Sequence, residues 1–270
     1  MKLGVIIHAS RSAPADFARR LVEAAEAGGH TVVGDESTAR LLGRSVEVGD
    51  PEVIVASGGD GTVLAAVQRA LTLDVPVLAF NLGTIGFLAD AEPDDLARVL
   101  DALGSGRLIE RRRMTIRAVL DNGALGVGIN DVVVEKIESQ RLVALEVSID
   151  EEPFLVYRAD GLVVATSTGS TAYNFSAGGP LVDPAVEALL LTPVAPHSLF
   201  NRTMVMPTTA RIRISVTADR PVRVSIDGVE TGSLNQGGHV DVFCDGRSVR
   251  FLTLDPASFP ATVKRKFRLN

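Results

Sequence analysis

The hexapeptide Ser57-Gly58-Gly59-Asp60-Gly61-Thr62 carries the residue types best suited to chemistry in this chain. It follows a short apolar, β-branched run at 53–56, which predicts a buried strand, and it precedes apolar residues at helical spacing. In a strand-loop-helix unit of an open α/β sheet, the loop lies at the carboxyl end of the strand, where ligands bind. Three glycines leave backbone N–H groups bare, and these can bind an anion, usually a phosphate. A carboxylate there would repel phosphate, so Asp60 is expected to hold Mg²⁺ or to accept a proton.

The spacing excludes the two commonest phosphate-binding loops. A P-loop has the pattern G-x-x-x-x-G-K-[ST], which occurs nowhere, and the only lysines are Lys2, Lys136, Lys264 and Lys266. The dinucleotide pattern G-x-G-x-x-G is also absent from Gly58-Gly59-Asp60-Gly61 and from a second glycine loop, Gly83-Thr84-Ile85-Gly86. The first loop is therefore a phosphate-binding candidate of another kind.

A second informative stretch runs from Asp160 to Pro180. An apolar run at 162–165 predicts a strand, and the hydroxyl-rich residues 166–171 and the turn at 176–180 then offer small donors and close backbone approach. The alternative is a turn-rich loop between strands, where serine and glycine are common. No G-x-S-x-G motif surrounds the serines, so serine hydrolysis has little support.

Other polar groups have two interpretations each. Asn130-Asp131 precedes a valine run and suits the two adjacent hydroxyls of a ribose, or is a polar pair at a strand start. The arginines at 111–113 could hold phosphates, but such a run is usually a solvated face. The sequence indicates no serine or cysteine partner for His197, which favours a structural or substrate-lining role over a catalytic one. Tyr173 and Phe87 could stack on a base, with core packing as the alternative for Phe87.

Composition bounds the class of protein. The chain has 270 residues, 46% of them hydrophobic, which suffices for one large domain or two ordinary ones. A net charge of −6 argues against a non-specific nucleic-acid binder and against binding to an anionic membrane. The single cysteine, Cys244, cannot form an internal disulfide, and the histidines show no zinc pattern. Residues 1–7 are too short for a signal peptide and no apolar run is long enough for a membrane span, so we expect a soluble, cytoplasmic protein.

Strands and helices are predicted to alternate in the first part of the chain. Strands are expected at 3–7, 31–34, 53–57 and 76–80. Helices are expected from Ser12 and Pro14 to the stop at Gly28-Gly29, after Thr62, and at 93–103. A short segment at 39–42 is assigned neither type. This alternation predicts a parallel, Rossmann-like α/β domain over 1–112.

Beyond Arg111 the pattern changes to strands with regular turn signals. Alternating or extended runs occur at 115–120, 131–135, 142–149, 211–217, 222–227, 240–244 and 249–254, with turns at Asn122-Gly123 and Asp227-Gly228. Residues 184–191 are expected to form a short helix as the one exception. These runs predict a second, all-β domain over 113–254.

Taken together and in this order, the motifs resemble those of NAD kinases of the bacterial type, over nearly the whole length. They are Gly58-Gly59-Asp60-Gly61-Thr62, Asn81-Leu82-Gly83-Thr84-Ile85-Gly86-Phe87-Leu88, Asn130-Asp131, Asp160-Gly161-Leu162, Thr168-Gly169-Ser170-Thr171-Ala172-Tyr173-Asn174, Ser176-Ala177-Gly178-Gly179-Pro180 and Pro196-His197-Ser198-Leu199. The first motif alone is shared with diacylglycerol and sphingosine kinases. A lipid or polyol kinase, and a non-catalytic NAD(P)-binding sensor, are therefore the alternatives.

The resemblance implies Mg²⁺-dependent transfer of a phosphoryl group from ATP, or from polyphosphate, to the adenosine ribose 2′-hydroxyl of NAD, which gives NADP. It implies an α/β domain, a β-sandwich-like domain, a chain end (255–270) that packs back on the first domain, and a homodimer or homotetramer. By motif position Asp60 matches the proton acceptor, and the donor phosphates are expected at Gly58, Gly59, Gly61 and Thr62. The expected NAD-binding residues are Asp60, Gly61, Asn130, Asp131, Arg141, Arg158, Asp160, Thr171, Ala172, Tyr173, Asn174, Phe175, Ser176 and Ala195. Val229 stands where the family often has glutamine, and Mg²⁺ is expected to be held mainly through the donor phosphates.

Overall fold

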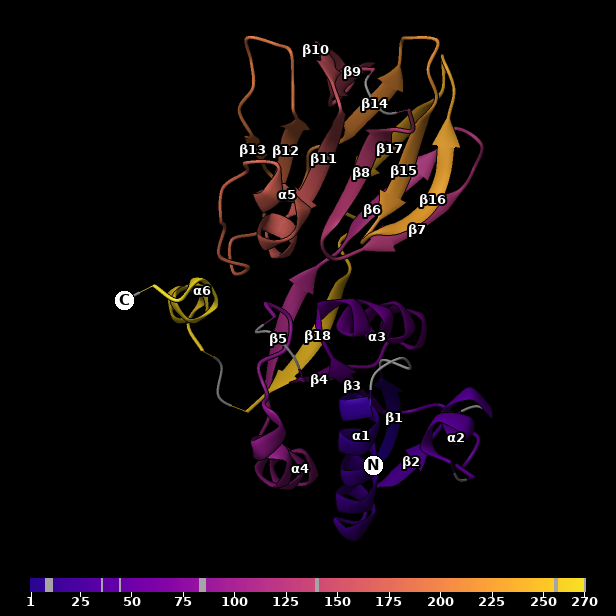
Figure 1. Ribbon diagram of the computed structural model, residues 1–270, viewed down its shortest axis with the longest axis vertical. Helices are drawn as coiled ribbons and strands as arrows, with labels where there is room; N and C mark the ends of the chain where they lie inside the picture. The colour runs from indigo at the N-terminus through magenta and orange to yellow at the C-terminus, as the bar shows by residue number, and fades with distance from the viewer. Residues whose placement is uncertain are drawn as a thin grey trace. The chain divides into compact units, whose positions relative to one another are not determined.

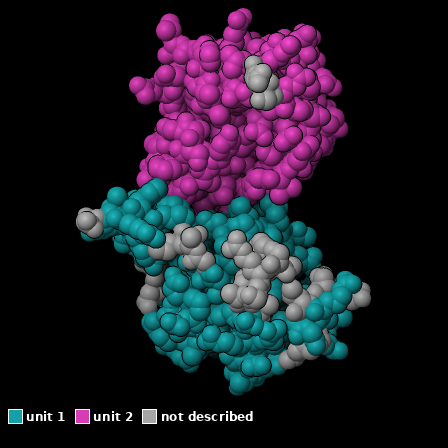
Figure 2. Space-filling view, viewed as in Figure 1, with its two compact units in different colours: residues 1–112, 249–270 teal, residues 113–248 magenta. Residues whose placement is uncertain are grey.

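The structure is a computed structural model that describes residues 1–7, 12–34, 36–43, 45–82, 86–138, 141–254 and 257–269 (Figure 1). Its contacts divide the chain into two compact units (Figure 2). Unit 1 comprises residues 1–112 and 249–270, and unit 2 comprises residues 113–248. Within the described residues, no helix is long and apolar enough to span a membrane.

Unit 1 is built on a six-stranded sheet in the order β2-β1-β3-β4-β18-β5. The pairs from β2 to β18 are parallel, as the predicted alternation of strands and helices requires. Its elements are β1 (Lys2–Ile7), α1 (Ser12–Ala27), β2 (Thr31–Val33), α2 (Glu36–Leu42), β3 (Val53–Gly58), α3 (Asp60–Leu73), β4 (Val77–Asn81), η1 (Pro93–Asp95), α4 (Leu96–Gly104), β5 (Ile109–Met114), β18 (Ser248–Thr253) and α6 (Phe259–Phe267). Every residue of β3 and β4 is buried, which explains why both strands read as continuous apolar runs.

The strand β18 departs from the sequence-based expectation, which placed 249–254 in the second domain. It pairs with β4 through Phe251 and Leu252 and therefore belongs to the sheet of unit 1. The alternating pattern of this segment predicts a strand correctly but does not identify the strand beside it. The helix α6, which follows β18 after a short connection, also belongs to unit 1.

Unit 2 contains two six-stranded sheets in which every described strand pair is antiparallel. One sheet has the order β10-β9-β14-β17-β6-β7, and the other has the order β13-β12-β11-β8-β15-β16. The elements are β6 (Ile116–Leu120), β7 (Leu125–Gly128), β8 (Asp131–Lys136), β9 (Val143–Ile149), β10 (Glu152–Ala159), β11 (Gly161–Thr166), η2 (Thr168–Thr171), α5 (Tyr173–Ser176), β12 (Leu189–Val194), β13 (Met204–Met206), β14 (Ile212–Val216), β15 (Val222–Ile226), β16 (Val229–Leu234) and β17 (His239–Phe243).

One apolar core joins the two sheets of unit 2 and makes it a sandwich. Leu145 and Val147 of β9 and Val134 and Leu162 of the other sheet belong to the same buried cluster. The second sheet is also covered on its other face, because Val133, Val163 and Leu190 form a separate buried cluster with Val182. Burial on both faces explains why β8 and β11 read as unbroken apolar runs.

The expectation of a short helix at 184–191 is wrong. Residues from Leu189 onward form β12, which pairs along its whole length with β11. A short apolar run does not distinguish a buried strand from a buried helix, and here the neighbouring strand decides.

Candidate functional site

The glycine loop of unit 1 lies at the carboxyl end of β3, as expected. Gly58 ends the strand, Gly59 is the N-cap of α3 in an extended conformation, and Asp60 is the first helical residue. Within the described part of the chain, no side chain caps the N-terminus of this helix. The first backbone N–H groups of a helix have no intrahelical acceptor, so this end can bind an anion.

The three glycines of the loop have different surroundings. A Cβ atom on Gly58 would lie 2.4 Å from Oγ1 of Thr62, so the fold itself requires glycine there. A Cβ atom on Gly59 or Gly61 would meet no described atom within 4 Å. The backbone at Gly59 and Gly61 therefore faces open space through which a ligand could approach.

Two hydroxyl groups of the same loop are buried without a hydrogen-bond partner among the described residues. They belong to Ser57, which is fully buried, and to Thr62, which is 6% exposed. A buried hydroxyl without a partner costs about 1–3 kcal/mol, and native structures rarely leave one unexplained. Both groups belong to the loop expected to bind the donor phosphates, although neither oxygen is accessible to solvent. Of the two residues, only Thr62 is among the predicted phosphate-binding residues.

The carboxylate of Asp60 is held by the loop that follows β4. Its oxygens accept hydrogen bonds from the backbone N–H groups of Phe87 at 3.2 Å and Leu88 at 3.3 Å. A Cβ atom on Gly86 would lie 2.0 Å from Oδ1 of Asp60, so glycine is required beside the carboxylate. The sequence identified the loop but not this contact, and Gly83, Thr84 and Ile85 lie outside the described residues.

Phe87 packs within unit 1. Its ring lies 6.3 Å from the ring of Phe267 in α6, and the ammonium of Lys266 lies 4.5 Å from its centroid. The helix α6 therefore supports the residue whose N–H donates to Asp60. Of the two interpretations of Phe87, these contacts match packing.

In unit 2, Asn130 ends the turn after β7 and Asp131 begins β8, and both are buried, with 8% and 4% exposure. The loop after β11 closes over this turn: the N–H of Thr166 donates to Asn130 O at 2.8 Å, and a Cβ atom on Gly169 would lie 1.9 Å from the same oxygen. The structure thus brings together the polar pair and the hydroxyl-rich loop, which are 35 or more residues apart in sequence. The hydroxyl of Thr168 in this loop is buried without a described partner.

Burial, and after it the charge of the nearby Asp227 carboxylate, raise the pKa of Asp131 to about 7, although the backbone N–H of Tyr173 lowers it. Asp227 accepts hydrogen bonds from the N–H groups of Ile129 at 2.9 Å, Asn130 at 2.8 Å and Asp131 at 3.2 Å. Burial raises the pKa of Asp227 as well, while these three N–H groups lower it. Sequence reasoning noted Asp227 only as half of a turn signal and missed this contact.

The loop residues 171–176 separate into supporting and exposed side chains. The amide of Asn174 is fully buried, donates to Ser170 O and Pro180 O, and accepts from Thr192, so it holds the loop from inside. Tyr173 and Phe175 are about 40% exposed. Burial raises the pKa of the Tyr173 phenol, as do the charges of nearby acidic side chains. Thr171 and Ala172 are half-buried, and Ser176 is exposed.

Arg158, Asp160 and Ala195 form a second group at the other end of β8 and β11. Asp160 pairs with Lys136 at 2.5 Å, and its N–H donates to Val194 O beside Ala195. Asp131 and Lys136 stand at opposite ends of β8, roughly 17 Å apart at about 3.3 Å per residue. The second group thus lies about one strand length from Asn130 and Asp131, and the Tyr173 phenol is close enough to both Asp131 and Asp160 for their charges to raise its pKa.

The remaining candidates lie elsewhere on their units. Arg141 is exposed just before β9. The arginines at 111–113 lie in β5, an edge strand, where Arg112 pairs with Glu110. His197 is exposed and its N–H donates to Arg158 O, and Val229 is 68% exposed.

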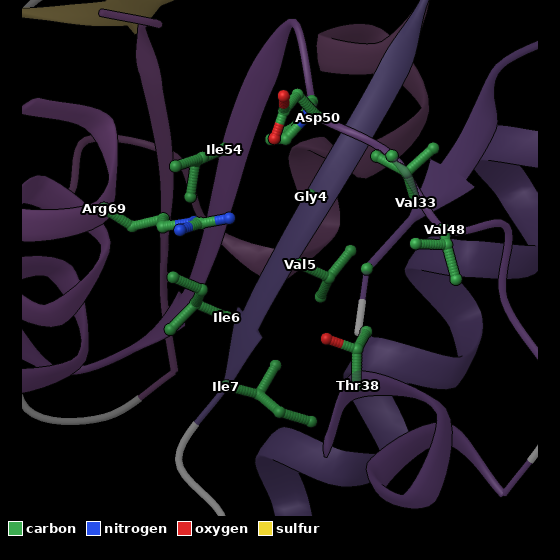
Figure 3. A pocket seen from close by; sticks show the side chains of 13 residues that line it. Gly4, Val5, Ile6, Ile7, Val33, Thr38, Val48, Asp50, Ile54 and Arg69 are labelled. Carbon is green, nitrogen blue, oxygen red and sulfur yellow. The ribbon is translucent and has the colours of Figure 1, made fainter. Parts of the chain in front are cut away.

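A cavity of about 700 Å³ lies beside β1 in unit 1 (Figure 3). Its lining is mainly apolar, and in Figure 3 the guanidinium of Arg69 points toward β1 from one side while Thr38 lies on the other side. The described residues that line it include none of the glycine loop. The cavity is therefore separate from the site that the sequence predicted.

No cluster of three or more His, Cys, Asp or Glu side chains that could hold a metal occurs in the described part of the chain. Mg²⁺ usually binds through one or two carboxylates together with substrate phosphates. Asp60, beside a helix end that no described side chain caps, fits a metal held in that way and does not form a ready-made protein cage.

The comparisons with known proteins agree across the chain. Residues 32–108 match the family model of the ATP-NAD kinase N-terminal domain, and residues 129–254 match that of the ATP-NAD kinase C-terminal domain. NAD kinase 2 of Streptomyces avermitilis is 40% identical over 81% of this chain and 74% of its own length. The NAD kinase of Methanoregula boonei is 34% identical over 94% of each chain.

Two solved structures have the same fold. A yeast NADH kinase complexed with NADH superposes with a TM-score of 0.90 and 25% identity, covering 100% of this chain and 88% of its own. An Archaeoglobus fulgidus NAD kinase in complex with ATP gives 0.75 at 23% identity, covering 100% of this chain and 97% of its own, which supports the fold alone. With both domain models matched in order and relatives of this identity along most of its length, the chain belongs to the NAD kinase family.

Proposed function

We propose that this chain transfers the γ-phosphoryl group of Mg²⁺-bound ATP to the 2′-hydroxyl of the adenosine ribose of NAD, producing NADP and ADP. The observation that carries the proposal is the position in which the Asp60 carboxylate is held. A single carboxylate, fixed by two backbone N–H groups, lies at the uncapped N-terminus of α3 beside glycines that face open space. Membership of the NAD kinase family supports the choice of substrates.

Asp60 is proposed to orient the 2′-hydroxyl and to accept its proton. The ribose oxygen forms a bond to the γ-phosphorus while the bond to the β–γ bridging oxygen breaks, and ADP leaves with that electron pair. Phosphoryl transfer has a loose transition state, so placement in line and neutralisation of charge matter most. General-base help supplies about 10²- to 10⁴-fold in rate, whereas positioning can supply roughly 7–11 kcal/mol. The two N–H groups on Asp60 support the positioning role in particular.

The donor phosphates are proposed to bind at Gly58, Gly59, Gly61 and Thr62. The N-terminus of α3 favours negative charge, and the backbone at Gly59 and Gly61 faces open space. Mg²⁺, held mainly by those phosphates, would neutralise their charge when it is bound. Asp60 is the side chain of this loop that could add a ligand to it.

NAD is proposed to bind through Asn130 and Asp131, which suit two adjacent ribose hydroxyls because a carboxylate accepts and an amide both donates and accepts. The exposed rings of Tyr173 and Phe175 can stack on a base, and the internal amide of Asn174 keeps their loop in place. The remaining proposed NAD contacts are Gly61, Arg141, Arg158, Asp160, Thr171, Ala172, Ser176 and Ala195.

The proposal is tested with Asp60→Asn and a matched control, Asp74→Asn, at the other end of the same helix. Asp74 is the C-cap residue in the left-handed conformation, which asparagine adopts readily. With Mg²⁺-ATP and NAD, the wild type and Asp74→Asn should form NADP, and Asp60→Asn should form none while it still binds NAD in calorimetry.

Near-normal turnover by Asp60→Asn would refute the role of Asp60. If the wild type formed no NADP but phosphorylated a lipid alcohol or a polyol, the alternative kinase activity would replace the proposal. NAD binding without turnover on any of these acceptors would identify a sensor.

We also propose that the enzyme works in the cytoplasm as a homodimer or homotetramer, and that polyphosphate could replace ATP as donor. Sedimentation equilibrium determines the oligomeric state. Parallel assays with ATP and with polyphosphate determine the donor.

A further inference from the structure

We propose that Asp227 is a positioning residue for NAD: its carboxylate fixes the main chain of the turn that presents Asn130 and Asp131. This inference rests on the proposed function, in which those two side chains bind the ribose. Asp227 itself touches no substrate in this scheme and acts through the turn.

Four hydrogen bonds join Asp227 to the turn. Its Oδ2 accepts from the N–H of Ile129 at 2.9 Å, and its Oδ1 accepts from the N–H groups of Asn130 at 2.8 Å and Asp131 at 3.2 Å. The N–H of Asp227 donates in return to Asp131 O at 3.0 Å. Three successive N–H groups directed at one carboxylate fix the dihedral angles of the turn, and with them the directions in which both side chains leave it.

Two glycines leave the space around the turn that this arrangement needs. A Cβ atom on Gly128 would lie 2.6 Å from Oδ1 of Asp227, and a Cβ atom on Gly169 would lie 1.9 Å from Asn130 O. Asp227 thus contacts the turn on one side and the loop after β11 contacts it on the other. The turn is therefore closely surrounded by Asp227 and by the loop after β11.

The charge of Asp227 is not needed for its own hairpin. Asp227 and Gly228 form the two-residue turn between β15 and β16, with φ of 49° and 78°, and Asn-Gly serves such a turn equally well. An asparagine would also avoid a second carboxylate beside the buried Asp131. A carboxylate at this position despite that repulsion points to the N–H groups of the neighbouring turn as its purpose, because hydrogen bonds to an ionised acceptor are about twice as strong as neutral ones.

The groups that face Asp131 predict a readout specific to this role. They are the carboxylate of Asp227 from the β15–β16 turn, and the backbone N–H and the phenol of Tyr173 from the loop after β11. Removal of the Asp227 charge removes one of the causes that raise the pKa of Asp131. NAD binding should therefore depend differently on pH in a variant without that charge.

The experiment measures the Kd for NAD by calorimetry between about pH 5 and 9, with the KM for ATP, in the wild type, Asp227→Asn, Asp227→Ala and Asp131→Ala. Asp150→Asn is the matched control, because Asp150 also lies in a hairpin turn with positive φ and accepts a backbone N–H, from Arg211, away from the Asn130-Asp131 turn. Circular dichroism establishes whether each variant is folded. If Asp227→Ala is not folded, the test relies on Asp227→Asn.

We expect Asp227→Ala to raise the Kd for NAD about 10- to 100-fold, as the loss of hydrogen bonds to a charged group predicts, with an unchanged KM for ATP. Asp227→Asn should raise the Kd less and shift the pH profile of NAD binding to lower pH. Asp150→Asn should match the wild type in both.

Two negative results are distinguishable. If Asp131→Ala weakens NAD binding but folded Asp227→Asn keeps the wild-type Kd and pH profile, the positioning role is wrong and the ribose assignment stands. If Asp131→Ala itself binds NAD like the wild type, the proposed ribose site is wrong.

Discussion

A Cβ atom on Gly86 would lie 2.0 Å from Oδ1 of Asp60, closer than any side chain can approach a carboxylate oxygen without moving it. The position of the Asp60 carboxylate therefore depends on the space that glycine leaves at residue 86 and on the hydrogen bonds from the N–H groups of Phe87 and Leu88. A residue with no functional group of its own thus determines where the proposed proton acceptor lies.

Gly86→Ala should lower kcat on the order of 100-fold, because a displacement of about 1 Å in a reacting group has that effect. The Kd for NAD measured by calorimetry should stay within a few-fold of wild type. Gly104→Ala is the control, since its new Cβ atom would lie at an ordinary 3.7 Å from the His30 ring. A wild-type kcat in folded Gly86→Ala would show that catalysis does not depend on the position of the Asp60 carboxylate beside Gly86.

The glycines of the loop should respond differently to alanine. Gly58→Ala forces a Cβ atom to 2.4 Å from Thr62 and should lower the free energy of unfolding by about 1–3 kcal/mol, as overpacking does. Gly59→Ala meets open space and should keep its stability while the KM for ATP rises. Urea denaturation and donor kinetics measure the two effects. Unchanged donor kinetics in Gly59→Ala would contradict a phosphate cradle there.

The raised pKa of Asp131 makes stability depend on pH with a defined sign. Folding raises this pKa from 3.8 to about 7, so the folded state binds the proton more tightly than the unfolded state. The stabilisation of the folded state by this tighter proton binding is fully present below pH 3.8 and is lost as the pH rises through about 7. Asp131→Asn cannot bind this proton and lacks the stabilisation. Between about pH 4 and 8 the wild type should therefore lose at most about 4 kcal/mol of unfolding free energy relative to Asp131→Asn. Urea denaturation at several pH values measures this difference. If the free energy of unfolding depended on pH in the same way in both proteins, the raised pKa of Asp131 would be contradicted.

The contact between α6 and Phe87 should influence Asp60 from a distance. Phe267→Ala removes a ring pair and loosens the helix that carries Lys266, contacts worth about 1 kcal/mol together. The amides of Phe87 and Leu88 should then exchange hydrogen faster, and kcat should fall several-fold. Lys264→Ala, at an exposed position of the same helix, should change neither quantity. Unaltered exchange at both amides in Phe267→Ala would exclude the coupling.

Local chemistry of the sequence determined much of this protein. The run from 53 to 73 predicts a strand, a glycine loop and a helix because hydrophobic period and glycine placement act over a few residues, and β3, the loop and α3 follow that pattern. The turns at Asn122-Gly123 and Asp227-Gly228 are likewise present, with positive φ at Gly123, Asp227 and Gly228. The order of the motifs identified the family.

Only the tertiary structure decided which segments lie next to each other. It placed β18 in the sheet of unit 1, made Leu189 and its neighbours a strand, put Gly86 against Asp60, and directed Asp227 at a turn almost a hundred residues earlier in the chain. Strand partners and hydrogen-bond partners at such separations depend on how whole elements pack. No periodicity or turn signal in a single stretch of sequence encodes that packing.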